Sequence, residues 1–157
     1  MRSVLRLELE EARVMLEAAK RVAQKLNVPE TICVVDDGGV VIALERMDGA
    51  RITGPELAIA KAFTASGHKR STHLFNQPGG PATVTGEAFG IHAMIPGKFA
   101  IFVGGFPVVV NGEVIGGIGV SGGSGEQDIA VGVAALQALQ AHLGAEHEVL
   151  AQADIKK

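Results

Sequence analysis

The sequence predicts a single domain of the α+β class. Its 157 residues are 47% hydrophobic, which is enough to bury one continuous core without disulfides or metals. Segments with a helical repeat of apolar residues alternate with segments rich in β-branched residues, and tight turns join most of the expected strands. Because strands joined by tight turns are antiparallel neighbours, we expect an α+β fold and not a parallel sheet.

The first expected elements are a helix and a hairpin. Between Leu9 and Leu26, apolar residues recur at steps of three and four, and glutamates precede the basic residues, which matches the helix dipole. Two apolar runs then flank the sequence DDGG at 36–39. Asp and Gly favour turns, so we expect a β-hairpin between about residues 31 and 48.

A second helix is expected from residue 53 onwards. The sequence TGPE at 53–56 has the pattern of a capping box with an early proline, and Gly67 lies where a left-handed cap would end the helix. From Gly67 to Gly97 the pattern is irregular, with His, Pro and Gly between short apolar pieces. A connection of this length inside a small domain usually carries binding or oligomer contacts.

The last part of the chain predicts strands, a hairpin and a closing helix. Residues 98–122 have strand character, with Asn111 and Gly112 as a type I′ turn. The sequence SGEQ at 124–127 is a second capping box, and its helix is expected to end at Gly144. One domain therefore spans 1–157, with a structured core over about 5–144 and a polar C-terminal tail.

Composition and charge exclude several classes of partner. A net charge of −3 without any block of like charges argues against nucleic acid. The apolar runs are too short to cross a bilayer and the N-terminal segment lacks a signal-peptide pattern, so no membrane partner is expected. Cys33 is the only cysteine, which favours a reducing compartment. We therefore expect a cytoplasmic protein.

A glycine-rich segment raises the question of nucleotide binding. Residues 117–122, GIGVSG, match the glycine fingerprint of dinucleotide-binding folds. That fingerprint requires a further strand after its helix, and here the following helix is the last expected element, so no nucleotide is expected. Gly116, Gly117 and Gly119 instead allow either a helix or a flat ligand to lie against the strand, and close packing is the simpler interpretation.

Two basic side chains are candidates for contacts with an acidic ligand. Arg46 follows the second strand and either grips a carboxylate through two parallel hydrogen bonds or pairs with Asp48 or Glu45. Lys61 interrupts an apolar helix, where it either extends its charge to solvent or meets a carboxylate such as Asp48 or a ligand's acid group.

The histidines of the irregular connection are the candidates for metal ligation. His73 and His92 have no neighbours at zinc-site spacing, but a single imidazole in an apolar pocket is enough to ligate a haem iron. In an enzyme, these histidines, Glu126 or Asp128 would act as acid or base near neutral pH.

Three longer motifs occur together: VVDDGGVVIALERMDGA at 34–50, AIAKAFTA at 58–65 and GGFPVVVNGEVIGGIGVSGGSGEQD at 104–128. With Pro96-Gly97 and the alanine-rich closing helix, they resemble the GlcG/HbpS-like haem-binding family, which is similar to the C-terminal domain of PduO-type proteins. The resemblance extends from about Leu7 to about Leu143, and the set of motifs is specific although each alone is weak.

The resemblance implies a profilin-like fold, with a five-stranded antiparallel sheet flanked by helices. It also implies homo-oligomers, from dimers to octamers, with ligand sites at or near subunit contacts, and some members bind haem or iron. Arg46, Asp48, Lys61 and Gly119 stand at recurrent positions of the family pattern. The irregular connection departs from that pattern, and its sequence is expected to set what fits the pocket.

The leading hypothesis is a homo-oligomeric protein that binds haem or another planar, acid-bearing molecule at a subunit interface. In this hypothesis His92 or His73 approaches the metal or ring, and Arg46 and Lys61 face carboxylates. Asp48, Gly119 and Glu126 complete the expected ligand-binding set. The alternative is a cofactor-independent enzyme that acts on a small organic acid from aromatic or glycolate catabolism. A purely structural oligomerisation module is the third hypothesis.

Overall fold

The chain forms four strands and five helical segments. The computed structural model describes residues 1–157. The elements in chain order are α1 (Leu9–Lys25), β1 (Thr31–Asp36), β2 (Val41–Arg46), α2 (Gly54–His68), the short 3-10 helix η1 (Thr72–Phe75), α3 (Ile91–Met94), β3 (Gly105–Val110), β4 (Glu113–Ser121) and α4 (Gly125–Leu143). The α+β class predicted from the sequence is therefore confirmed.

The four strands form one antiparallel sheet in the order β2-β1-β4-β3. Both expected hairpins are present. Oδ1 of Asp36 accepts hydrogen bonds from the N–H groups of Gly38 and Val40, each at 2.9 Å, and closes the β1–β2 turn. Asn111 and Gly112 have φ of 50° and 80°, the left-handed conformation that a type I′ turn requires.

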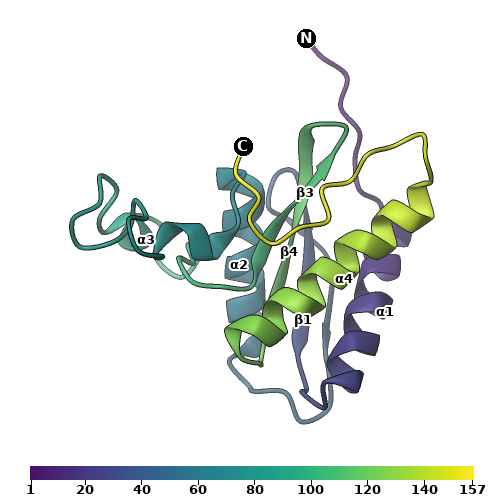
Figure 1. Cartoon of the computed structure of the whole chain (residues 1–157), viewed down its shortest axis with the longest axis horizontal. Helices are drawn as coiled ribbons and strands as arrows, with labels where there is room; N and C mark the ends of the chain where they lie inside the picture. The colour runs from purple at the N-terminus through teal and green to yellow at the C-terminus, as the bar shows by residue number, and fades with distance from the viewer.

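Helices cover both faces of the sheet. Figure 1 shows α1 and α4 side by side on one face and α2 on the other. The main core lies under α1 and α4, where it includes Met15, Leu16, Phe106, Ile118 and Leu136. On the opposite face α2 approaches β4 very closely, because strand glycines leave room for its backbone.

The glycines of β4 serve close packing. A Cβ atom at Gly119 would lie 1.9 Å from the carbonyl oxygen of Ala58, and one at Gly117 would lie 2.4 Å from that of Ala62. These distances are far inside van der Waals contact, so α2 occupies the space in which a flat ligand would have to lie. The close-packing interpretation of this segment is confirmed.

The expectation of a five-stranded sheet was wrong, because the sheet has four strands. Residues 98–104, which have strand character in the sequence, run as a loop into β3. Thr64 of α2 holds this loop: its hydroxyl donates to the carbonyl of Lys98 at 3.2 Å and accepts from the N–H of Ala100 at 2.8 Å. The side chain of a helix thus supplies the hydrogen bonds that a neighbouring strand would have made.

The structured core extends beyond residue 144, where it was expected to end. Val149 and Ile155 are buried in the main core, and the N–H of Leu150 donates to the carbonyl of Val109 at 3.2 Å. The segment also forms an isolated bridge between Val149 and Val110. It therefore covers the outer edge of β3, whose unpaired backbone groups would otherwise face solvent.

The helix ends agree with the sequence in part. Ser124 and Gln127 form the expected capping box, with Ser124 Oγ accepting the N–H of Gln127 at 3.3 Å. Thr53 makes no side-chain cap and has helical φ and ψ of −80° and −9°, so the expected box at 53–56 does not form. The left-handed residue after α2 is Lys69, with φ of 53°, and not Gly67.

None of the helices combines the length and the apolarity needed to cross a membrane.

Candidate functional site

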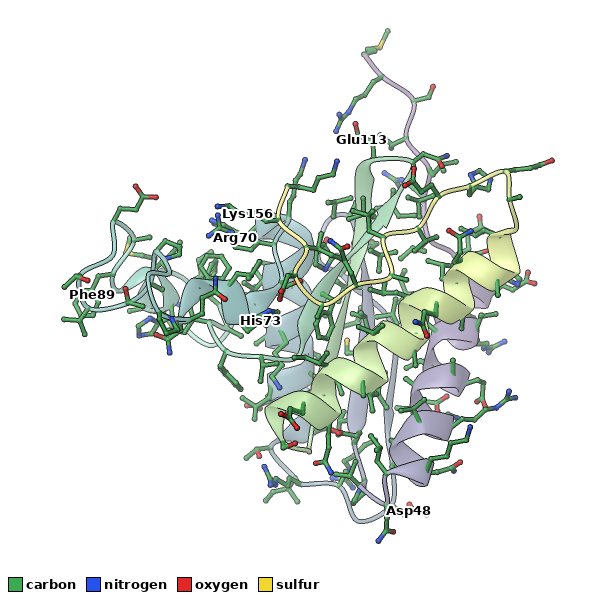
Figure 2. The ribbon with its side chains drawn as sticks, viewed as in Figure 1. Asp48, Arg70, His73, Phe89, Glu113 and Lys156 are labelled. Carbon is green, nitrogen blue, oxygen red and sulfur yellow. The ribbon has the colours of Figure 1, made fainter.

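A projecting arm, residues 76–99, presents apolar side chains to solvent. In Figure 1 it extends sideways from the body of the molecule and carries α3. Val84, Phe89 and Met94 are 81%, 64% and 77% exposed, and Ile95 is exposed as well. Figure 2 places Phe89 at the far end of the arm. Large apolar side chains grouped in this way on a surface are typical of a binding or subunit contact.

Backbone hydrogen bonds give the arm a defined conformation. The N–H of Ala82 donates to the carbonyl of Phe75 at 2.9 Å, and the N–H of Ala88 donates to that of Pro81 at 2.8 Å. The turn between them needs glycine, because a Cβ atom at Gly86 would lie 2.2 Å from the Pro81 carbonyl oxygen. The arm therefore folds back on itself and holds its apolar side chains outward.

Three rings anchor the base of the arm. His68, Phe75 and Phe99 meet edge to face, with centroids 5.1 to 5.3 Å apart. Burial lowers the pKa of His68, and the nearby charge of Arg70 lowers it further. The imidazole of His68 is thus held in its neutral form, as an aromatic contact of the arm.

The two candidate histidines have different surroundings. His73 on η1 is partly buried, and its Nε2 pairs with the Asp154 carboxylate, while its Nδ1 is buried without a partner. His92 on α3 is exposed among the apolar side chains of the arm and makes no hydrogen bond to another side chain. Only His92 therefore presents both ring nitrogens to a ligand. No group of three or more His, Cys, Asp or Glu side chains gathers as a metal site.

Lys61 pairs with Asp128 and not with Asp48, the partner suggested from the sequence. Its Nζ lies 3.0 Å from Oδ2 of Asp128, donates to the carbonyl of Val120 at 2.6 Å and lies 4.8 Å from the centre of the Phe102 ring. Lys61 and Asp128 are both nearly inaccessible to solvent. The charge of Lys61 is thus paired in the protein interior and is not accessible from the surface.

Glu30 completes this buried cluster, and no pattern in the sequence had pointed to it. The N–H of Gly123 donates both to Glu30 Oε2 at 3.1 Å and to Asp128 Oδ1 at 3.0 Å, so the two carboxyl groups adjoin. Burial raises the pKa of Glu30 to about 8, and the charge of Asp128 adds to the effect. Burial also lowers the pKa of Lys61, against the opposing effect of Asp128. Because Glu30 is fully buried, the cluster is a charge network of the interior.

The remaining candidates do not converge with the histidines. Arg46 ends β2, is exposed and pairs with neither Asp48 nor Glu45, since the Glu45 carboxylate lies 2.6 Å from Lys20 Nζ. Figure 2 shows Asp48 at the lower end of the molecule, far from Phe89 on the arm. Glu126 is exposed in the first turn of α4. The candidate site supported by the geometry is therefore the arm with His92.

Comparison with known proteins decides the family. The sequence family described as a haem degrading protein, HbpS-like, matches residues 7–137. The chain belongs to the HbpS-like family. The resemblance identified from the sequence motifs is thereby confirmed.

Relatives of this HbpS-like chain include a protein of similar length and a much longer one. An uncharacterised 15.0 kDa protein from the dhaT-dhaS intergenic region of Citrobacter freundii is 38% identical over 124 residues, which are 74% of this chain and 85% of the relative. The corrinoid adenosyltransferase PduO of Salmonella typhimurium is 36% identical over 128 residues, which are 80% of this chain. The HbpS-like chain spans only 36% of the length of that PduO.

A solved structure shares the fold of this HbpS-like chain. The crystal structure of a PduOC–haem complex superimposes with a TM-score of 0.79 at 32% identity, covering 94% of this chain and 99% of the other. This chain therefore shares its overall fold with a protein that has been crystallised with haem.

Proposed function

We propose that this chain binds haem on the arm, where an imidazole nitrogen of His92 would hold the iron. The observation that carries the proposal is the exposed imidazole of His92 on an arm that also exposes the apolar side chains of Phe89 and Met94. A neutral imidazole nitrogen is the commonest protein ligand of haem iron, and an apolar surface favours the flat porphyrin. The haem complex of a homologous domain supports the choice of ligand.

The residues of the arm fit the group that the family implies. His92 has no competing partner, whereas His73 is engaged by Asp154 and would have to exchange a carboxylate for the iron. When bound, haem would supply an iron centre for ligand exchange or redox chemistry. The contribution of this chain would be the imidazole nitrogen of His92 and an apolar surface that excludes water from the bound group.

We extend the proposal to a homo-oligomer in which a second copy covers the arm. Val84, Phe89, Met94 and Ile95 leave apolar area in water that one chain alone does not bury. A second copy would cover this area and provide the other wall of the haem pocket.

Cys33 is buried and unpaired, which fits a reducing compartment such as the cytoplasm.

An absorbance titration of the apo-protein with hemin tests the function. We expect a saturable, shifted Soret band in the wild type and in His73→Ala, and loss of that band in His92→Ala. His147→Ala, outside the arm, is the matched control and should behave as the wild type. A nonspecific spectrum in every protein would remove haem from the account and favour an organic-acid enzyme.

A further inference from the structure

The segment after α2 and the end of the chain bring two positive side chains, those of Arg70 and Lys156, next to each other. Arg70 and Lys156 are direct partners in an antiparallel bridge. The N–H of Lys157 donates to the carbonyl of Lys69 at 3.0 Å, and the N–H of Ser71 donates to that of Ile155 at 2.8 Å, so the two segments are firmly aligned. Directly opposed residues on paired strands have Cβ atoms about 5 Å apart, which places the side chains of Arg70 and Lys156 next to each other.

No acidic side chain neutralises this group. None of the ion pairs in the structure includes Lys69, Arg70, Lys156 or Lys157. The guanidinium of Arg70 instead lies 5.1 Å from the centre of the Phe75 ring, which fixes its position without neutralising its charge. Like charges directly opposite each other on paired strands are destabilising. An anion between them would remove that repulsion.

The two cations line a surface pocket at the base of the arm. The pocket has a volume of about 340 Å³ and is formed by Arg70, Lys156, Gly79, Gly80, Pro81, Gly86 and Glu87. Figure 2 shows Arg70 and Lys156 together on the same side of the body as the arm. Three of the lining residues are glycines, so few side chains obstruct the approach of a small polar group to the two cations. Glu87 is the single acidic residue of the lining and pairs with neither of them.

We infer that the pocket between Arg70 and Lys156 is a binding site for the carboxylate groups of a small molecule. The planar guanidinium matches a carboxylate through two parallel hydrogen bonds, and the lysine adds a second, mobile charge. In this inference Arg70 and Lys156 make the contacts with a ligand carboxylate that the sequence analysis suggested for Arg46 and Lys61. The carboxylates belong either to the propionates of haem or to a separate organic acid, and the chemistry of recognition is the same.

The direct test uses malonate, a small dicarboxylate, and needs no haem. Amide resonances of the full-length apo-protein are followed by two-dimensional NMR at low ionic strength, with chloride at equal ionic strength as the reference. A purification tag is placed at the N-terminus, because Lys156 is part of the pocket. We expect saturable shifts centred on residues 79–87 and 155–157.

Charge-neutral variants assign the site. Arg70→Gln and Lys156→Gln should each weaken malonate binding by about tenfold or more, since each removes a charged hydrogen bond. Lys25→Gln, which removes an exposed charge at the end of α1, should leave the affinity unchanged. Saturable binding that survives both pocket substitutions, or an absence of saturable shifts in the wild type, would overturn the assignment.

A second experiment separates the two sources of carboxylate. Hemin and hemin dimethyl ester are compared in the wild type and in Arg70→Gln. A preference for hemin that disappears in Arg70→Gln assigns the pocket to the propionates. Equal binding of hemin and its ester, together with malonate binding, assigns it to a separate acid. If hemin fails to bind at all, the malonate result still decides the pocket, so the two proposals fail independently.

Discussion

The ammonium group of Lys61 lies 3.0 Å from the carboxylate of Asp128, although both side chains are almost completely buried. Lys61 belongs to α2 and Asp128 to the first turn of α4, so the pair joins the helical layers on the two faces of the sheet. Desolvation offsets much of the attraction in such a pair, but loss of one partner leaves an uncompensated charge in the interior. Loss of Lys61 alone is therefore expected to lower the free energy of unfolding.

Replacing Lys61 by methionine should destabilise the protein by about 3–5 kcal/mol, because Asp128 then remains buried without its cation. The measurement is urea unfolding at a fixed protomer concentration. Lys20→Met removes two ion pairs at the surface, with Glu17 and Glu45, and should cost less than about 1 kcal/mol. Lys61→Met/Asp128→Leu should be more stable than Lys61→Met, since it removes the unpaired charge as well. A cost for Lys61→Met no larger than that for Lys20→Met would contradict the account.

Glu30 should make stability fall as the pH rises from about 5 to 8. Its pKa is raised to about 8 in the folded protein, so the folded state holds a proton in this range that the unfolded chain has released. Folding stability then decreases with pH, with a limiting slope of about 1.4 kcal/mol per pH unit for one proton.

The slope is measured by urea unfolding at several pH values in the wild type and in Glu30→Gln. The amide keeps the shape and the neutral charge of the protonated carboxyl group, so we expect a smaller slope in the variant. Glu126→Gln, at an exposed carboxylate, is the control and should retain the wild-type slope. Identical slopes in all three proteins would show that Glu30 is not protonated in the folded state.

Gly119 should tolerate no side chain. A Cβ atom there would lie 1.9 Å from the Ala58 carbonyl oxygen, so Gly119→Ala must displace α2 from β4 and should cost about 3 kcal/mol or more. Gly67→Ala is the matched control, since it lies within α2 with nothing within 4 Å of the new atom, and it should stabilise the protein by about 0.5–1 kcal/mol. Thermal unfolding of both variants checks the pair. Equal melting temperatures would refute the close approach.

The C-terminal segment should contribute to global stability. Ile155 is 1% exposed, so Ile155→Ala should cost about 2–4 kcal/mol through the lost contacts and the cavity left behind. Ile52 is 86% exposed, and Ile52→Ala should change stability by less than about 0.5 kcal/mol. Chemical unfolding distinguishes them, and a neutral Ile155→Ala would mean that the segment is detached in solution.

Local sequence signals predicted the elements whose structure is decided locally. The apolar repeat of α1, the turn residues Asn111 and Gly112 and the capping box at Ser124 all form as expected. Residues 98–104 have strand character, but Thr64 of α2 holds them as a loop, and this contact is set by tertiary packing. The segment 145–157 is polar in composition, yet Val149 and Ile155 are buried in the core and its backbone pairs with β3 and with the segment after α2.

The candidate site was predictable only where one short segment carries it. His92 lies within three positions of Phe89, Met94 and Ile95 in the sequence, so these residues could be recognised together without the structure. Asp128 is 67 residues from Lys61, and Asp154 is 81 residues from His73, so neither pairing had a sequence signal. The Arg70–Lys156 pocket depends in the same way on a bridge between distant segments.

Chemical rescue of His92→Gly tests whether His92 supplies the nitrogen that holds the haem iron. The variant removes the imidazole and leaves the rest of the arm intact, so hemin should lose the shifted Soret band of the wild-type complex. Free imidazole added to the variant with hemin should restore that band, because it supplies the missing axial nitrogen. A wild-type spectrum and affinity in His92→Gly without imidazole would show that the iron is bound elsewhere.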